Sequence, residues 1–348
     1  MYRFLPPSFG PRHNNGNFIV NKHYAQDECD FKGMLLQEYN TPCNNDMLVV
    51  LPFFNPCNSI RLVQNLLLIK SKFDVSKTPY IIIHCLFPNS MKLMQTSSTY
   101  VTVRSASYAF LKENLANIAI TSYGSGYNKF MILDADVIFE SKNWYDIVSN
   151  TLDTVSVVQP YSEFKNLDIN FFKVCKSGEG TLYKEIVSRK ICDDASCKLK
   201  DDDTGHPGYC IAFTKKFLEK QKYPDINLIG GGDTLMCSLV LKRKLFEQHV
   251  NSKYYHFAYD KYITDSEFTW GVISGTVFHL CHNYAENRQY STRYFILSKY
   301  INDDEEYKTI EDIIYKNKDG VYEWIDEIRD NINIDMLNYF TSRQDDEV

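Results

Sequence analysis

Short continuous apolar runs alternate with amphipathic stretches along the first half of the chain. The runs Met47–Phe54, Thr78–Phe87 and Lys129–Asp136 are strand-length and apolar throughout most of their length, which is typical of strands buried on both faces of a parallel sheet. Between them, apolar positions with helical spacing predict helices over about residues 58–72 and 105–119. This β-α-β-α-β series predicts an α/β fold with a parallel sheet and helical crossovers.

The second half of the chain shows weaker patterns. A further strand is predicted at residues 154–158, and the polar stretch 175–203 is interpreted as an insertion. Its acidic run, residues 201–203, is interpreted as a solvated loop. The predicted division is an N-terminal leader at 1–44, an α/β domain at 45–300 and an acidic, helical C-terminal extension at 301–348.

Composition places the chain among ordinary globular proteins. Of 348 residues, 44% are hydrophobic and 24% are charged, which excludes collagen-like, coiled-coil and wholly disordered chains. The formal net charge of −6 predicts no broad basic surface, so nucleic acid is not expected as a partner.

Targeting and redox signals point to a cytoplasmic protein. No apolar run approaches the roughly 18 residues of a membrane span, and the first 20 residues lack the apolar block of a secretory signal. The ten cysteines are scattered without a CxxC pair, so free and mostly buried thiols are expected. We therefore predict a cytoplasmic location.

Asp134 and Asp136 follow directly after the third apolar run. Parallel α/β sheets bind ligands beyond the carboxyl ends of their strands, so both carboxylates are expected at the ligand crevice. Hard oxygen ligands of this kind hold Mg²⁺ or Mn²⁺ together with a diphosphate. The alternative is that the two aspartates only cap the following turn.

His279 and His282 follow a second short apolar segment, residues 275–278. Two imidazoles three residues apart fit a metal site begun by Asp136. A zinc site that adds Cys281 is an alternative, although no second Cys/His pair at finger spacing accompanies it. Ordinary hydrogen-bonded histidines are the other alternative.

Asp233 ends the segment Gly230–Asp233. Consecutive glycines allow a sharp turn or a close approach to a ligand, and an aspartate at the start of a helix can accept a proton from an attacking hydroxyl. The alternative for Asp233 is a helix N-cap.

The order of these motifs resembles the GT-A class of nucleotide-sugar glycosyltransferases, over about residues 46–294. It is closest to family-2-like enzymes and is similar to β-1,4-galactosyltransferases and polypeptide N-acetylgalactosaminyltransferases. The resemblance implies a Rossmann-like, mostly parallel sheet flanked by helices, a nucleotide-sugar donor and a glycan or glycoconjugate acceptor. It also implies Mn²⁺ or Mg²⁺ as cofactor, with Asp136, His282 and His279 as ligands.

The same resemblance implies roles for residues around the donor. Phe53 and Asn55 are expected beside the nucleotide base, Lys112 at the nucleotide or diphosphate, Asp134 at the ribose or donor sugar, and Arg288 at the phosphates. Lys112 stands where galactosyltransferases usually carry arginine.

The resemblance further implies Asp233 as the general base of an inverting transfer. Gly232 stands where many members carry glutamate, and Arg293 is a second candidate for a phosphate contact. His206, Tyr209 and Trp270 are expected to shape an acceptor pocket, because sugars stack on aromatic rings.

The predicted activity is metal-dependent transfer of a sugar from a nucleotide diphosphate, with UDP favoured, to an acceptor hydroxyl with inversion. One alternative is a phosphohydrolase of the haloacid dehalogenase type, which also places a DxD motif after an apolar strand. The other is a non-catalytic protein that binds sugar nucleotides on a transferase fold.

Overall fold

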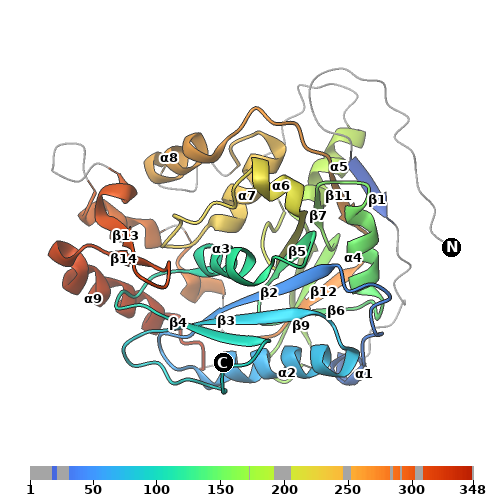
Figure 1. The fold of residues 1–348 in the computed structure, drawn as a ribbon, viewed down its shortest axis with the longest axis horizontal. Helices are drawn as coiled ribbons and strands as arrows, with labels where there is room; N and C mark the ends of the chain where they lie inside the picture. Colours follow the sequence, from blue (N-terminus) through green and yellow to red (C-terminus); the bar gives the residue numbers. More distant parts are fainter. Residues whose placement is uncertain are drawn as a thin grey trace.

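The protein is built around a central eight-stranded sheet. The computed structural model describes residues 18–21, 31–171, 173–191, 205–245, 252–282, 285–290, 292–301 and 309–346. The strand order in the central sheet is β1-β11-β7-β10-β5-β2-β3-β4 (Figure 1). Every neighbouring pair is parallel except those of β10, which runs antiparallel to both β5 and β7. The predicted class, a mostly parallel sheet flanked by helices, is confirmed.

The strands of the central sheet are short and mostly buried. In chain order they are β1 (Phe18–Asn21), β2 (Met47–Phe54), β3 (Tyr80–Leu86), β4 (Tyr100–Arg104), β5 (Lys129–Leu133), β7 (Val157–Gln159), β10 (Cys210–Thr214) and β11 (Trp270–Ile273). A second sheet, in the order β6-β12-β8-β9, contains β6 (Val137–Phe139), β8 (Glu163–Leu167), β9 (Val174–Glu179) and β12 (Thr276–His279). Strands β13 (Ile314–Lys316) and β14 (Tyr322–Trp324) form a hairpin.

Helices cover both faces of the central sheet. They are α1 (Phe31–Leu36), α2 (Ile60–Ser76), α3 (Lys112–Tyr123), α4 (Trp144–Leu152), α5 (Thr181–Ile191), α6 (Lys215–Lys220), α7 (Gly232–Leu241), α8 (Ser252–Tyr262) and α9 (Asp326–Ser342). Three 3-10 helices lie at Ala285–Arg288, Arg293–Lys299 and Ile310–Ile313. In Figure 1 helix α2 lies on one side of β2 and β3, and α3, α7 and α8 lie on the other.

Strand β2 shows why the apolar run is continuous. Successive side chains of a strand point to opposite faces, so a strand covered on both faces needs an apolar residue at every position. Leu48 and Val50 belong to the core cluster that includes α3 residues, whereas Val49 and Leu51 belong to the cluster that includes α2 residues. The predicted bounds of this strand are those observed.

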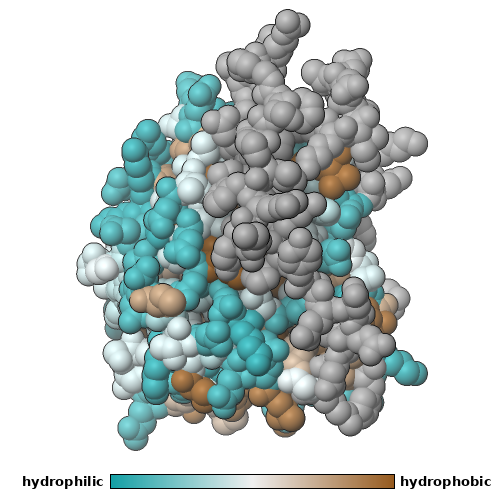
Figure 2. Space-filling view, turned by 90° about the vertical axis from the view of Figure 1, so that its right-hand side faces the viewer, coloured by the Kyte–Doolittle hydropathy of each residue, from teal (hydrophilic) through white to brown (hydrophobic). Residues whose placement is uncertain are grey.

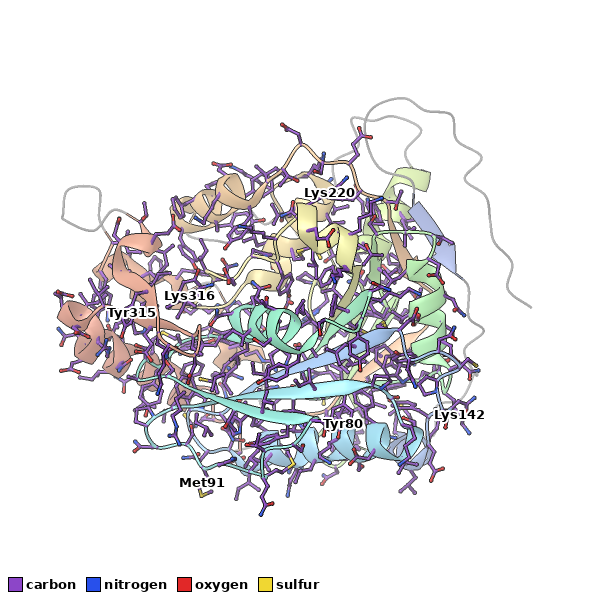
Figure 3. All side chains as sticks on the ribbon, in the orientation of Figure 1. Tyr80, Met91, Lys142, Lys220, Tyr315 and Lys316 are labelled. Atoms are coloured by element: carbon purple, nitrogen blue, oxygen red, sulfur yellow. The ribbon has the colours of Figure 1, made fainter. Side chains whose placement is uncertain are left out.

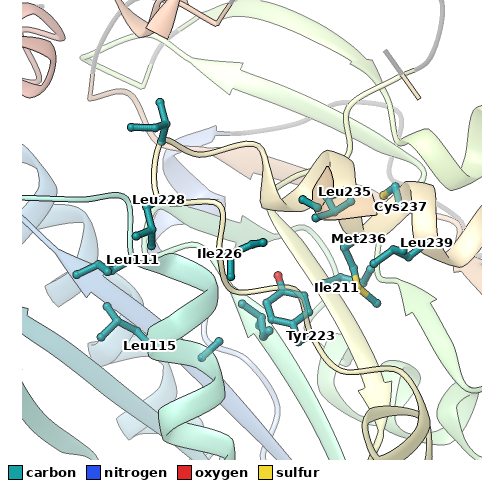
Figure 4. Packing of buried hydrophobic residues seen from close by; sticks show 14 of the residues in the cluster. Leu111, Leu115, Ile211, Tyr223, Ile226, Leu228, Leu235, Met236, Cys237 and Leu239 are labelled. Atoms are coloured by element: carbon teal, nitrogen blue, oxygen red, sulfur yellow. The ribbon is translucent and has the colours of Figure 1, made fainter. Parts of the chain in front are cut away.

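The core on the α3 side is continuous from the sheet to the later helices. Figure 4 shows Leu111 and Leu115, at the start of α3, beside Tyr223, Ile226 and Leu228 of the segment that precedes α7. In the same view Leu235, Met236, Cys237 and Leu239 of α7 pack toward Ile211 of β10. This packing fixes the start of α7 relative to the start of α3.

Helix α3 begins later than the predicted start at residue 105. The Ser105 hydroxyl donates to the carbonyl of Ser107 and accepts from its N–H, so these residues form a local turn that competes with helix. The α2 prediction is closer. Ser59 caps the helix by accepting from the N–H of Leu62, as its type suggests.

Part of the stretch 175–203, which was predicted to be an insertion, forms a strand and a helix. Strand β9 pairs with β8 at the edge of the second sheet, and α5 follows it. The edge position explains the polar sequence, because the side chains of Val174–Ser177 are exposed. Cys192, Cys197 and the acidic run 201–203 lie outside the described residues.

The C-terminal extension is only partly helical. It contains the β13–β14 hairpin before α9, and Trp324 of this hairpin is fully buried and donates its indole N–H to the carbonyl of Tyr108. Figure 3 shows Tyr315 and Lys316 of the hairpin at the opposite end of the molecule from Lys142. Strand β4 was also missed by the prediction, because its five residues follow a polar segment with no clear alternation.

Part of the predicted leader belongs to the central sheet. Strand β1, from the predicted leader, pairs in parallel with β11 of the central sheet, while the division into leader, domain and extension stays a prediction. The face in Figure 2 is largely hydrophilic where it is coloured, with apolar residues scattered over it. None of the described helices combines the length and the apolar character needed to cross a bilayer. The seven described cysteines are free, and four of them are buried.

Candidate metal and donor site

Asp134 and Asp136 form the DxD motif, two aspartates separated by one residue. They lie on the segment that joins β5 of the central sheet to β6 of the second sheet. Asp134 follows the last residue of β5, and its N–H donates to the carbonyl of Tyr209. Asp136 precedes β6, where Val137 pairs with His279 of β12. The carbonyl of Asp136 accepts from the N–H of Leu280 at 2.8 Å. Antiparallel pairing of β6 with β12 therefore places Asp136 beside the two histidines.

Asp136, His279 and His282 form a compact group of metal-ligand atoms. Oδ2 of Asp136 lies 3.0 Å from Nε2 of His282 and 3.5 Å from Nε2 of His279. One ligand atom from each residue lies within 4.8 Å of the other two. Among the described residues, Oδ1 of Asp136 is buried without a hydrogen-bond partner. A buried carboxylate oxygen without a donor is costly unless a cation binds it, so the group fits a divalent ion.

Hydrogen bonds around His282 settle its neutral tautomer. Arg288 has no acceptor atoms, so its Nη2, 2.7 Å from Nε2 of His282, must be the donor. Nε2 then carries the lone pair, and Nδ1 carries the proton that is donated to Asp345 Oδ1 at 3.1 Å. Nε2 of His282 also lies 3.0 Å from Asp136 Oδ2, so a cation bound between these two atoms would take the place of the Arg288 N–H on Nε2.

The ionisation states also suit metal binding. Burial alone would raise the pKa of Asp136, but the neighbouring His279 and His282 outweigh it and hold this pKa well below its ordinary value. Burial lowers the pKa of His279, although Asp136 opposes the effect. An ionised carboxylate beside a neutral imidazole is the protonation state that metal ligation needs.

Lys112 joins the other carboxylates of the site. Its Nζ lies 2.6 Å from Asp134 Oδ1, and 2.8 and 3.0 Å from the two oxygens of Asp233. Burial would lower the pKa of Lys112, but these carboxylates raise it well above the ordinary value, so the lysine is cationic. The two aspartates of the DxD motif thus point to different partners, Asp134 to Lys112 and Asp136 to the histidines.

Asp134 is less acidic than an ordinary aspartate. Burial raises its pKa to about 6, Lys112 opposes that rise, and the carboxylates of Asp233 and Asp136 add to it. The predicted alternative, in which both aspartates only cap a turn, does not describe either side chain, since both face ionic partners.

The three glycines before Asp233 are explained by side chains that press against them. A Cβ at Gly230 would lie 2.9 Å from the Arg293 guanidinium, and one at Gly231 would lie 2.2 Å from the Tyr294 hydroxyl. Gly230 and Gly231 also have φ angles of 96° and 92°, which L-residues rarely adopt. The glycines thus permit a turn and close packing within the chain. Gly231 is the N-cap of α7, so the N-cap alternative for Asp233 is wrong.

Gly232 makes room for Glu113, which sequence reasoning missed. A Cβ at Gly232 would lie 2.0 Å from Glu113 Oε1, and Glu113 is 2% exposed. The glycine stands where the resemblance implies a glutamate, and the carboxylate that lies against this position comes instead from α3.

Replacing Gly232 by alanine is expected to destabilise the protein by about 1–3 kcal/mol, since the methyl group would overpack the buried Glu113. Urea unfolding measures this change. Gly126→Ala is the control, because a Cβ there meets nothing within 4 Å, and it is expected to stay within about 0.5 kcal/mol of the parent. Equal losses in the two variants would contradict the packing assignment, and adding Glu113→Ala to Gly232→Ala should recover part of the loss.

Stability should fall as pH rises through the range in which Glu113 keeps its proton. Burial, together with the charge of Asp233, raises the pKa of Glu113 from 4.5 to about 8. Between these values the folded protein holds a proton that the unfolded chain has lost, so each pH increase favours unfolding. Glu113→Gln removes the ionisable group and with it this pH dependence. The melting temperature of the variant relative to the parent should therefore rise by on the order of 5 °C between about pH 5 and pH 8. A constant difference over that range would contradict the raised pKa.

The expected base-binding residues lie at the end of β2. The Phe53 ring is buried and makes an edge contact with His84 at 5.0 Å. Asn55 is also buried, and its side chain is bonded to the backbone of Ser59, which it joins to the strand end. Both residues shape the β2–α2 turn, and their contact with a nucleotide stays a prediction.

The aromatic residues expected at the acceptor separate into two groups. His206 and Tyr209 stack with ring centroids 4.0 Å apart, and Tyr209 lies 5.2 Å from the ring of His279. Trp270 was wrongly included, because it is 2% exposed within β11 and cannot offer its ring to a sugar. Its strand is a central one, where large apolar residues belong to the core.

Glu113 and Asp345 are site residues that the sequence did not reveal. Glu113 reads as an ordinary exposed residue in the first turn of a helix, and Asp345 reads as part of a solvated acidic end. The sequence offered one signal that Glu113 belongs to the site, its position next to Lys112. It offered none for Asp345.

A mostly parallel sheet flanked by helices, with a single antiparallel strand and a C-terminal helix, forms the scaffold of this site. No protein-family model and no curated protein sequence matches the chain.

The solved structures to which the chain is similar are distant in sequence and give low TM-scores. Glucosyl-3-phosphoglycerate synthase from Mycobacterium tuberculosis, solved with Mg²⁺ and UDP, is 10% identical over 78% of this chain and 83% of its own, with a TM-score of 0.35. A glycosyltransferase involved in glycosylation of the major capsid of PBCV-1 is 12% identical over 71% and 97%, with a TM-score of 0.28. The catalytic domain of Drosophila β1,4-galactosyltransferase 7, solved with xylobiose, is 10% identical over 50% and 51%, with a TM-score of 0.27. The chain therefore spans about half of that domain.

Proposed function

We propose that this protein is a metal-dependent glycosyltransferase. It transfers a sugar from a nucleotide-diphosphate donor, with a UDP-sugar favoured, to a hydroxyl of a glycan or other acceptor. The observation that carries the proposal is the convergence of Asp136 Oδ2 on Nε2 of His282 and of His279, with Asp136 Oδ1 left unpartnered among the described residues. This group lies where strands β5 and β12 end, at the crevice in which α/β sheets bind ligands.

The ligand atoms of Asp136, His279 and His282 support Mn²⁺ as the bound ion, with Mg²⁺ as the alternative. Two imidazoles and one carboxylate are a mixed nitrogen and oxygen set, whereas Mg²⁺ favours oxygen ligands alone. A divalent ion held there would neutralise the charge that develops on a leaving nucleoside diphosphate. Asp136, His279 and His282 would hold it.

Asp233 is the proposed general base of an inverting transfer. Its carboxylate stands in the first turn of α7 and is held by Lys112. The lysine orients the carboxylate and links Asp233 to Asp134. A diphosphate that draws Lys112 away would leave Asp233 free to accept the proton of the attacking hydroxyl. Arg288, bonded to His282, supplies a second cation on the metal side.

A panel of nucleotide sugars tests the proposal. Purified protein is incubated with UDP-, GDP- and other nucleotide sugars, with Mn²⁺, with Mg²⁺ and with chelator, and the released nucleotide is measured. We expect slow release from one donor only when a divalent ion is present. Release of inorganic phosphate from phosphomonoesters, with no donor consumed, would favour the phosphohydrolase alternative. Donor binding without turnover under any condition would favour the non-catalytic one.

The remaining expectations stay predictions. They are the cytoplasmic location, the contacts of Phe53 and Asn55 with the nucleotide base, and the lack of a nucleic-acid partner. The acceptor is expected near His206, since a Cβ at Gly208 would lie 3.0 Å from both His206 Cε1 and Asp233 Oδ2. Tyr209 is 4% exposed and, like Trp270, cannot offer its ring to a sugar.

A further inference from the structure

The segment that follows α9 returns to the candidate metal site. Asp345 Oδ1 lies 3.1 Å from Nδ1 of His282 and 3.3 Å from Nη2 of Arg343. The side chains of Asp345 and His282 are 8% and 4% exposed, so this contact is shielded from water. The arrangement is a carboxylate, an imidazole and a second carboxylate in series, from Asp345 through His282 to Asp136.

The series determines which nitrogen of His282 faces Asp136. A neutral imidazole that donates Nδ1–H to a carboxylate presents the lone pair of Nε2 on its opposite side. Carboxylates that hold ligating histidines in this way fix both the tautomer and the orientation of the ring. Arg343 accompanies Asp345, and this places a positive charge beside the carboxylate and favours its ionised form.

A second contact holds the same segment in place. The carboxylate of Asp346 accepts from the Ser59 hydroxyl at 2.7 Å and from the N–H groups of Ile60 and Arg61 at 3.1 and 2.9 Å. These N–H groups open helix α2 and have no partner within the helix, so a carboxylate stabilises them. Figure 1 shows the C-terminus beside α2.

We propose that Asp345 is a positioning residue that holds His282 with Nε2 toward Asp136, and that docking of residues 343–346 on the start of α2 is thereby coupled to metal binding. The proposal rests on the proposed function, because it takes Asp136, His279 and His282 as the metal ligands. Coupling is reciprocal, so metal binding should also strengthen docking of the segment.

Mn²⁺ titration of the full chain, followed by the electron paramagnetic resonance of free Mn²⁺, is the first test. Asp345→Ala should weaken Mn²⁺ binding about 10- to 100-fold, as loss of a carboxylate behind a ligating histidine does. The Mn²⁺ affinity of Asp345→Asn should lie between those of the parent and Asp345→Ala, since the amide oxygen of asparagine can still accept the Nδ1 proton of His282. Asp330→Ala is the matched control, because Asp330 is an exposed aspartate of α9. Equal affinities in Asp345→Ala and the control would overturn the proposal.

The tautomer of His282 in the metal-free protein is the second test. Long-range ¹H–¹⁵N correlation spectra should show the proton on Nδ1 in the parent and a mixture of tautomers in Asp345→Ala. An unchanged tautomer would overturn the positioning role even if the protein bound no metal. Absence of Mn²⁺ binding in the parent, with the tautomer shift intact, would count against the proposed function and the coupling, while the positioning role of Asp345 would stand.

Docking is tested with Asp346→Asn, which leaves Asp345 in place. We expect Mn²⁺ affinity to fall less than in Asp345→Ala, by about 2- to 5-fold, since one charged contact at a helix N-terminus contributes typically about 0.3–1 kcal/mol. Mn²⁺ should also slow carboxypeptidase removal of residues 343–346 in the parent. No effect of Mn²⁺ on that cleavage would contradict the coupling.

Discussion

Asp136→Asn is expected to abolish Mn²⁺ binding and to lower donor turnover by about 10²- to 10⁴-fold, since metal neutralisation of a leaving group supplies several kcal/mol. The neutral amide removes the only ionised ligand of the group while His279 and His282 stay in place. Calorimetric titration with Mn²⁺ and nucleotide release from the preferred donor measure the two effects.

Stability should fall together with activity in this variant. The ionised form of Asp136 is favoured in the folded protein, because His279 and His282 outweigh the effect of burial and hold its pKa well below the ordinary value. A carboxylate whose pKa is lowered by folding stabilises the folded state near neutral pH, so we expect the metal-free Asp136→Asn protein to melt below the temperature of the parent. An inactive variant that is also unfolded would not support a metal role, and full activity in a folded variant would contradict it. Asp330→Asn serves as the control.

Asp233→Asn is expected to lower kcat by about 10²- to 10⁴-fold, the range found for loss of a general base. Donor affinity measured in the presence of Mn²⁺ should change much less, because Asp233 pairs with Lys112 and is not one of the three residues of the metal group, Asp136, His279 and His282. The separation between kcat and donor affinity distinguishes a proton acceptor from a donor-binding residue.

Lys112 provides the control for the Asp233 assignment. Lys112→Met removes the cation that bridges Asp134 and Asp233, so both donor affinity and kcat should fall. Retention of the parent kcat in Asp233→Asn would show that the base lies elsewhere. Loss of donor binding in Asp233→Asn, equal to that in Lys112→Met, would assign Asp233 to the donor site instead.

The sequence predicted the parts of the fold that depend on local pattern. Strand β2 is apolar at every position because both of its faces are covered, and its predicted and observed bounds agree. The position of the DxD motif after β5 followed from the same logic. Helix α3 was misplaced because Ser105 and Ser107 form a turn whose hydrogen bonds compete with helix, and propensity alone does not reveal them.

Contacts between distant segments could not be predicted in the same way. Edge strand β9 carries exposed polar residues, which removes the apolar signal of a strand. Trp270 was assigned to a pocket by residue type, whereas its position in a central strand buries it. Asp345 approaches His282 across 63 residues of sequence, and nothing in the local pattern encodes that contact.

Within the candidate site, the sequence likewise predicted some contacts and missed those that depend on packing. The sequence brought Asp136, His279 and His282 together, and the structure confirms that they are neighbours. The sequence did not indicate that Lys112 would bridge Asp134 and Asp233, or that Glu113 would lie against Gly232. Those contacts depend on how α3 and α7 meet, which is a property of the packed core.

Calorimetric titration of UDP into the parent protein, first with Mn²⁺ and then with chelator, measures whether a metal ion at Asp136, His279 and His282 serves nucleotide binding. We expect UDP to bind with Mn²⁺, chelator to lower the affinity at least about tenfold, corresponding to about 1.4 kcal/mol, and Asp136→Asn to remove the difference. Equal UDP affinity with and without the ion, or no binding of any nucleoside diphosphate in either condition, would contradict this expectation.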